Sequence, residues 1–433
     1  MSSESSSDEE EELSWYETLQ RIKENDSRVE IINPGGDDIK NMTNEELEEL
    51  GRDIADNAHL VEINLSHAAL NDRSTTFLFQ GLTRSSSIEE LQLYSSLLYS
   101  NSNHFGTTGL RGFSAAGVRS MLPFLQNANS LTCLSLDNNN IQSEGFNLLF
   151  RALSDSPIES LGVNRCGIET IEIDIEHSPR HLKRLYLSEN NITIDGCLEL
   201  AKLLQGGDAA LTVLNLQRND IDDGGAEILV GALRSNTSLT VLDVRGNSGI
   251  SKRGVKMMLE LVNDISSIEA TLRSNHAMEY LWVTCNEDEP IKLIDNATNI
   301  SYKASSPEAA GREKVIRTQL NSKKRAQLAA LQGVNHSVYS EIDPLHLPEV
   351  LALVGRRHGQ AELYLALKSS IAGVISTVNR EQCIEVQMAY HASKLEEHAS
   401  KLEQLGAELA AIKAARGGRA EAEESHNNKR RRK

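Results

Sequence analysis

The chain has 433 residues, a hydrophobic content of 39% and a formal net charge of −18 at pH 7. Its length exceeds that of one ordinary domain, so two or more units are expected. The acidic balance argues against nucleic-acid binding, which needs a positive surface. The charge is uneven, because from Gly311 onward 20 Lys and Arg outnumber 14 Asp and Glu, so residues 1–310 carry the acidic excess.

Residues 1–26 are predicted to be an acidic disordered tail. The opening run from Met1 to Glu12 is too polar to bury anything and does not predict a secretory signal. Ser5, Ser6 and Ser7 each precede an acidic residue by three positions. This spacing is typical of acidic-directed kinase sites, and a purely solubilising tail is the alternative.

Residues 27–276 contain the recurring pattern L-x-x-L-x-L-x-x-N/C-x-L. Ala68 stands in the Asn position of the first copy, and Cys166 stands in that of the fourth. Most spacings between copies are 24 to 29 residues, and two degenerate copies are expected, around Val29–Ile32 and at Leu272 with Asn275. The seven clear copies begin at Leu60, Ile88, Leu131, Ile158, Leu182, Leu211 and Leu239.

Each copy predicts a short strand followed by a helix. In the third copy Leu134 and Leu136 face the core, while the residues between and beside them face outward. Thr43 and Glu46 predict a capping box at the start of a helix. Each motif Asn is expected to bind backbone groups where its strand turns away, and the small thiol of Cys166 fits the same place. The result is a right-handed α/β solenoid with a parallel concave sheet and convex helices.

The repeat resembles the leucine-rich-repeat family, in particular the long-repeat subclass typified by ribonuclease inhibitor. The resemblance covers residues 27–276 and implies a horseshoe-shaped solenoid that acts as a binding protein. Fold alone does not identify a ligand.

The outward strand positions are expected to bind a protein partner on the concave face, because Tyr and Arg anchor protein interfaces. A merely solvated polar face is the alternative. A second irregularity is an insertion near residues 99–111, which is either a functional loop or a tolerated extension. The candidate partner-binding residues are Tyr94, Asp137, Arg165, Arg184, Tyr186, Glu189, Arg218, Asp243 and Arg245.

Beyond residue 276 the chain changes character. Residues 277–310 are expected to cap the solenoid and form a linker, and residues 311–380 to form a helical region. Residues 381–415 show a heptad pattern that predicts a coiled coil, and this coil could form homo-oligomers. Histidine at two core positions motivates the hypothesis that protonation below about pH 6 loosens the coil. The predicted coiled-coil core is Ile384, Met388, His391, Leu395, His398, Leu402, Leu405, Leu409 and Ile412.

Residues 416–433 are predicted to be a disordered basic tail that ends in Lys429, Arg430, Arg431, Arg432 and Lys433. This cluster resembles a nuclear-import signal, with a nonspecific charged tail as the alternative. The five cysteines are far apart and indicate free thiols in a reducing compartment. No apolar run is long enough to span a membrane. We therefore expect an intracellular protein, cytoplasmic or, with a working import signal, nuclear.

No P-loop, zinc-ligand or nucleophile motif occurs in the sequence, so neither a cofactor nor an enzymatic activity is expected. The favoured hypothesis is a non-enzymatic protein-interaction scaffold whose partner the sequence does not identify. The alternative is a GTPase-activating protein, because Ran GTPase activators resemble this chain in their array of long leucine-rich repeats. Their acidic block after the repeats is absent here, with only Glu287, Asp288 and Glu289 nearby.

Overall fold

The computed structural model of the chain describes residues 14–95, 112–206 and 211–284, apart from 67, 69 and 267, together with the single residues 332 and 401. The chain divides into two compact units, residues 1–336 and 337–433. The basic tail, the 99–111 insertion and the first half of the acidic tail, residues 1–13, lie outside the described residues. So do the helical region, except Gln332, and the coiled coil, except Lys401.

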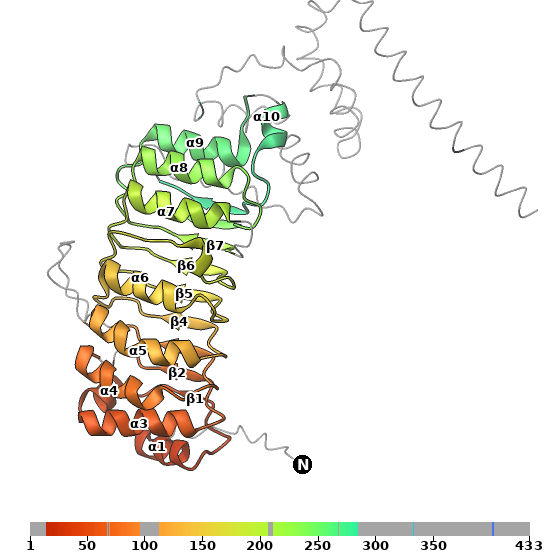
Figure 1. The fold of residues 1–433 in the computed structure, drawn as a ribbon. Coiled ribbons are helices and arrows are strands. Elements are labelled where there is room, and N and C mark those ends of the chain that lie inside the picture. Colours follow the sequence, from red (N-terminus) through yellow and green to blue (C-terminus); the bar gives the residue numbers. More distant parts are fainter. Residues whose placement is uncertain are drawn as a thin grey trace, which may run out of the picture. The chain divides into compact units, whose positions relative to one another are not determined.

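The described strands of the first unit form one parallel sheet in strict chain order (Figure 1). Each coil of the chain contributes one short strand, and neighbouring strands pair residue for residue, as Ile63 pairs with Leu91 and Leu91 with Leu134. The strands are β1 (Ile31–Ile32), β2 (Glu62–Asn64), β3 (Glu90–Gln92), β4 (Cys133–Ser135), β5 (Ser160–Gly162), β6 (Arg184–Tyr186), β7 (Val213–Asn215), β8 (Val241–Asp243) and β9 (Tyr280–Trp282).

Helices cover one side of this sheet and stack in chain order (Figure 1). Several of their N-termini are capped by the side chain of the N-cap residue. The predicted capping box of α3 is confirmed, with the Glu46 amide 3.2 Å from the Thr43 hydroxyl. The helices are α1 (Trp15–Lys23), α2 (Gly36–Lys40), α3 (Asn44–Asp56), α4 (Asp72–Leu82), α5 (Ala115–Asn127), α6 (Gln142–Ala152), α7 (Ile194–Gln205), α8 (Asp223–Leu233), α9 (Lys252–Asn263) and α10 (Ile268–Arg273).

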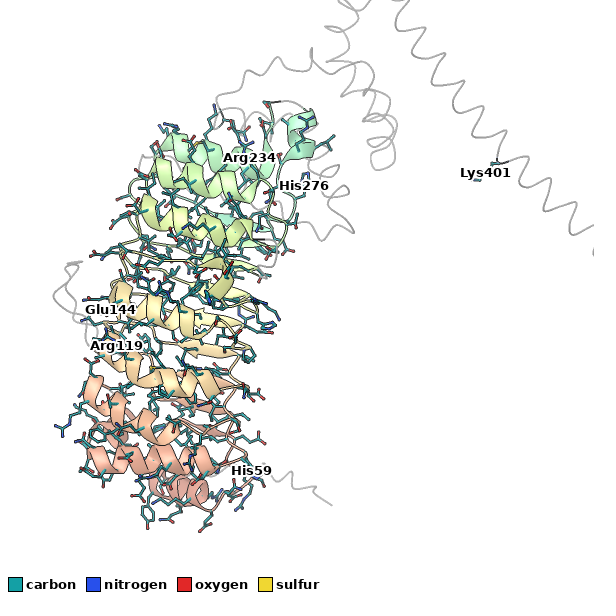
Figure 2. The ribbon with its side chains drawn as sticks, viewed as in Figure 1. His59, Arg119, Glu144, Arg234, His276 and Lys401 are labelled. Atoms are coloured by element: carbon teal, nitrogen blue, oxygen red, sulfur yellow. The ribbon has the colours of Figure 1, made fainter. Side chains whose placement is uncertain are left out.

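The core lies between the sheet and the helices, where the motif leucines and the inner helix residues are buried. The outer surface of the helix layer carries ion pairs between neighbouring helices. Arg119 on α5 meets Glu144 on α6 (Figure 2), and Arg253 on α9 meets Glu227 on α8. Because these side chains are exposed, the pairs contribute little stability, and burial of the motif residues is the main stabilising term.

The predicted asparagine ladder is present at the edge where the strands end. The Asn219 amide nitrogen donates to the carbonyls of Leu187, 2.9 Å away in the preceding coil, and of Leu216, 3.1 Å away in its own coil. Asn139, Asn190 and Asn247 make the same type of bonds. Cys166 occupies this place in its coil, with its sulfur 3.3 Å from the Leu136 carbonyl. These bonds satisfy buried carbonyls that would otherwise lack a partner.

A second ladder, not predicted from the sequence, runs along the ends of the helices. The side-chain amide of Asn57 donates to the carbonyl of Ile22 at the end of α1, and Asn236 and Asn275 do the same for α7 and α8. In each case the capping side chain comes from one coil further along the chain. At α9 the equivalent amide belongs to Gln332, which donates to the Asn263 carbonyl at 2.7 Å and accepts from the Ile265 amide at 3.2 Å.

One coil contradicts the prediction of a helix in every repeat. Between β5 and β6 the chain forms a short 3-10 helix (Ile175–His177), and no α-helix is present in this fully described stretch. This coil is the shortest of the array, and alternating isoleucines keep its chain extended, with Ile171 and Ile173 buried. Side chains of the flanking helices replace the missing helical bonds: Asn147 of α6 accepts from the Glu172 amide and Glu199 of α7 from the Ile173 amide.

Both predicted ends of the solenoid are also wrong. Residues 15–23, placed in the acidic tail, form α1, which buries Ile22 and is capped by the next coil. At the other end, the degenerate copy predicted at Leu272 is part of α10, whereas the degenerate copy near Val29 does form strand β1. The sheet continues past residue 276, because β9 pairs with β8.

Candidate functional site

The side of the sheet that the helices leave uncovered, here called the open face, is built by the period-two alternation of each strand. The middle residue of each three-residue strand faces the core and is fully buried, as Leu185 and Leu214 illustrate. The first and third residues face away from the core. Because neighbouring strands pair in exact register, these residues form straight rows across the sheet.

The structure divides the predicted partner-binding residues into separate groups. Tyr94 and Asp137 follow the neighbouring strands β3 and β4, and Arg165 follows β5. The remaining residues belong to β6–β8 or directly follow these strands, three or more strands away from Tyr94. The residues of this second group are Arg184, Tyr186, Glu189, Arg218, Asp243 and Arg245.

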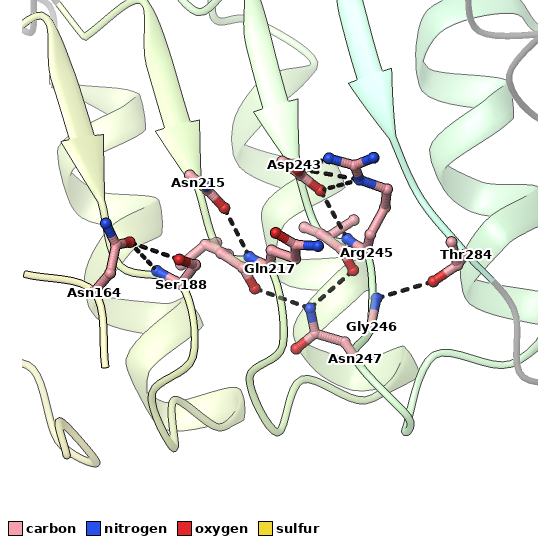
Figure 3. A network of polar contacts seen from close by, with 11 residues as sticks. Asn164, Ser188, Asn215, Gln217, Asp243, Arg245, Gly246, Asn247 and Thr284 are labelled. Atoms are coloured by element: carbon pink, nitrogen blue, oxygen red, sulfur yellow. Dashed lines mark hydrogen bonds and ion pairs between the residues drawn. The ribbon is translucent and has the colours of Figure 1, made fainter. Parts of the chain in front are cut away.

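The carboxylate of Asp137 is already hydrogen-bonded within the protein. Its carboxylate accepts from the backbone amide of Asn164 at 2.7 Å and from the Asn164 side chain at 3.1 Å. Burial raises the pKa of Asp137, and the bonds from Asn164 offset this only in part. Asn164 in turn accepts from Ser188, and separate polar contacts, such as that of Asn215 with the Gln217 amide, follow at the ends of the next strands (Figure 3). These bonds hold the strand ends in place, and Asp137 contributes to that framework.

Three residues occupy equivalent places in successive coils, each directly before the asparagine position of the motif: Arg165, Glu189 and Arg218. All three have positive φ values, between 53° and 55°, at the point where the chain leaves the sheet. Glu189 and Arg218 form an ion pair of 3.0 Å across the two coils. The next coil has Gly246 at this place, where an added Cβ would lie 2.7 Å from Cγ of Arg218, so only glycine leaves room for that side chain.

The strongest cluster on the open face lies at its C-terminal end. Asp243 is 3% exposed and binds the guanidinium of Arg245 through both carboxylate oxygens, the shortest contact being 2.7 Å (Figure 3). Arg245 then lies over the Trp282 ring, 5.0 Å from its centroid, and that ring is 5.9 Å from the ring of Tyr280. Asp243 therefore positions Arg245 and has no carboxylate surface to offer a partner, in contrast to its predicted role.

Tyr280 and Trp282 were missed as site residues. They retain 37% and 36% of their surface exposed, which is high for such large apolar side chains. The available signal was the spacing of Met278, Leu281 and Val283, which repeats the L-x-x-L-x-L core of the motif. The sequence predicts a strand-like run at Tyr280–Cys285 that closes the solenoid, but not that this run is another copy of the motif. Val241 and Val213 lie in the same row as Tyr280, so this row of the open face is apolar from β7 to β9.

The described residues contain no group of three or more His, Cys, Asp or Glu side chains that could hold a metal ion. The thiols within them are poorly reactive: burial raises the pKa of Cys166 far above the ordinary value and raises the pKa of Cys197 to about 12. No helix among the described residues is long and apolar enough to cross a membrane. The open face offers exposed aromatic rings and charged side chains, which can contact another molecule and complement its charge.

The family model "Leucine Rich repeat" matches residues 127–146, 178–201, 210–230 and 235–259. Ribonuclease inhibitor from Mus musculus is 27% identical over 42% of this chain and 40% of that protein. Ribonuclease inhibitor from Sus scrofa is 28% identical over 48% of this chain and 43% of that protein. RAN GTPase-activating protein 2 from Arabidopsis thaliana is 26% identical over 31% of this chain and 26% of that protein.

The matched region thus spans less than half the length of each of these relatives. The four family-model matches fall within the coils of the solenoid, where the motif leucines, the asparagine ladder and the parallel sheet agree with one another. The chain therefore contains leucine-rich repeats, and in the matched region it is similar to ribonuclease inhibitors.

Proposed function

We propose that this chain is a non-enzymatic protein that binds a protein partner on the open face, centred on β6–β9. The observation that carries the proposal is the exposed pair Tyr280 and Trp282, held in place by Arg245 and extended by Val241 and Val213. Interfaces gain most of their affinity from such aromatic and arginine anchors in a well-packed centre. The relatives named as inhibitors of an enzyme are consistent with a protein ligand for this fold.

The cluster is also suited to binding because it is rigid before the partner arrives. Asp243 holds Arg245, and Arg245 covers one face of Trp282. Little side-chain freedom is then left to lose on association, so more of the contact energy appears as affinity.

The test is affinity capture with the full-length chain and two variants. Proteins retained by the wild type and by Ile31→Ala but lost by Trp282→Ala are the expected partners. Ile31 is a matched control, because it is an exposed apolar residue (55%) of the same sheet at the opposite end. With a purified partner, Trp282→Ala is expected to weaken binding about 30-fold, or about 2 kcal/mol. Equal binding by both variants would place the interface elsewhere.

We further propose that residues 381–415 oligomerise the chain as a coiled coil. The support is the heptad pattern in the sequence, where two identical His-Ala-Ser-Lys-Leu-Glu runs are seven residues apart. Light scattering of the full chain should give a multiple of the 47.7 kDa mass, and Leu395→Ser with Leu402→Ser should return it to a monomer. A mass that is the same at pH 7.5 and 5.5 would refute the histidine hypothesis.

A GTPase-activating protein is the second candidate, because RAN GTPase-activating protein 2 is among the relatives. Single-turnover hydrolysis of GTP by a Ran-type GTPase, with and without the full chain, decides between the two. Acceleration would establish the activator, and an unchanged rate leaves the binding protein.

A further inference from the structure

The row of residues that starts each strand changes character at β6. Arg184, Val213, Val241 and Tyr280 stand side by side in register on β6, β7, β8 and β9. A charged residue therefore borders an apolar stripe that ends in the exposed aromatic pair. Neighbouring strands are about 4.8 Å apart, so Arg184 and Tyr280 are separated by about 14 Å along this row.

The arginines of the open face differ in whether the protein neutralises them. Arg218 is paired with Glu189, and Arg245 is paired with Asp243. Arg184 forms no ion pair with any residue in the described parts of the first unit. The carboxylate of Glu159 is ion-paired with Lys183 and not with Arg184. The hydrogen bond from Lys183 is the largest cause of the lowered pKa of Glu159, and the charge of Arg184 contributes less.

Arg184 is half-buried, lies next to an apolar stripe and has no carboxylate paired with it among the described residues. These features indicate which chemical group of a partner would bind it. The favoured group is a carboxylate, which the planar guanidinium binds through paired hydrogen bonds. The other half of the face discourages the same group, because Glu62 and Glu90 stand directly beside each other on β2 and β3. Charge complementarity therefore orients an acidic partner segment toward β6 and away from β2.

The geometry points to a protein partner whose binding segment presents an apolar side chain to Tyr280 and Trp282 and a carboxylate to Arg184, about three strand spacings away. This inference rests on the proposed binding at β6–β9 and adds the chemistry of the partner. The apolar contact supplies affinity, and the carboxylate supplies orientation and selectivity.

The test uses a library of random 12-residue peptides displayed on phage and selected against the full-length chain. The wild type is expected to select peptides that combine Asp or Glu with an aromatic or large aliphatic residue. Arg184→Glu is expected to lose the acidic preference, with selected acidic peptides binding at least 10-fold more weakly. Arg84→Glu is the matched control, because it makes the same charge change on an exposed arginine that follows α4 and is not a candidate partner-binding residue.

Three outcomes separate the two proposals. If selected peptides bind Trp282→Ala as well as the wild type, the interface is not at β6–β9 and the proposed function fails. If they need Trp282 but show no acidic preference, or if Arg184→Glu and Arg84→Glu weaken them equally, the inference about the partner is wrong while the site stands. Should Arg184→Glu not fold by circular dichroism, Arg184→Gln removes the charge without reversing it and provides the same comparison.

Discussion

The coils before β4 and those from β4 onward have the same interior but different edges. Both present fully buried leucines or isoleucines from every strand, such as Ile63 and Leu214. At the asparagine position, however, the first motif copy has Ala68, whereas β4 to β8 are followed by four asparagines and Cys166. The apolar core therefore suffices to form the sheet. The asparagine ladder at the strand ends is an additional feature that differs between the two regions.

The open face differs along the same direction. β2 and β3 begin with Glu62 and Glu90, and both end in an amide side chain, whereas β7–β9 begin with valine or tyrosine. Because the backbone register is the same throughout, nothing in the framework requires this change. Surface composition that changes while the framework stays constant is the expected mark of a localised interface.

The largest effect is expected from removing one rung of the ladder. Asn219→Ala takes away two donors to buried carbonyls and the acceptor of the Ile192 amide, 3.0 Å away. We expect a loss of about 3 kcal/mol in the free energy of unfolding, measured by urea titration. Asn129→Ala, at an exposed asparagine, should change little. Equal effects would mean that the ladder is as dispensable after β7 as it is at Ala68.

A substitution of Gln332 tests whether the C-terminal end of α9 needs the side-chain amide that caps it. Gln332→Ala removes both bonds to the end of α9, and we expect a loss of about 2 kcal/mol with faster amide hydrogen exchange in residues 252–265. Gln80→Ala is the control, because Gln80 is a glutamine on an exposed helix surface. Unchanged exchange at the end of α9 would show that this amide is not required there.

The sequence predicted most of the framework and little of the site. Leucine spacing located β2 to β8, because burial and period-two alternation leave a direct trace in residue types. The extended coil before β6 was not predicted, because the side chains of Asn147 and Glu199 that replace its helix come from neighbouring coils. Trp282 was missed because its role depends on contact with Arg245, which only the register of β8 and β9 creates.

In both regions an aspartate side chain accepts hydrogen bonds from backbone amides at the start of the next helix. Asp72 binds the Ser114 and Gly117 amides of the next coil at 2.6 and 3.0 Å. Asp223 binds the Ser251 and Gly254 amides at 2.8 and 3.0 Å. Each anchors the start of the following helix, so this device does not distinguish the early coils from the late ones.

Asp223→Asn should therefore destabilise the chain by about 1 kcal/mol at pH 7. Burial alone would raise the pKa of Asp223, but the bonds from Ser251 and Gly254 outweigh it and lower the pKa. A lowered pKa gives stability that is present above the unfolded value, near 3.9, and is lost as the pH falls through the folded value. The difference between wild type and variant should thus narrow below about pH 4, and a constant difference down to pH 2 would contradict this account.

The smallest effect is expected at Cys166, which takes the asparagine position after β5. Cys166 is fully buried, and its sulfur contacts the carbonyls of Leu136 and Asn164 at 3.3 and 3.4 Å. A thiol is a weak donor, whereas an amide of similar size could donate to these carbonyls and also accept from the backbone, as Asn190 accepts from the Cys166 amide. Cys166→Asn should therefore be neutral or stabilise the chain by up to about 1 kcal/mol. Cys166→Ala, which keeps neither bond, is the control and should destabilise it. If both variants destabilise the chain equally, the position selects for size and the ladder is interrupted at this coil.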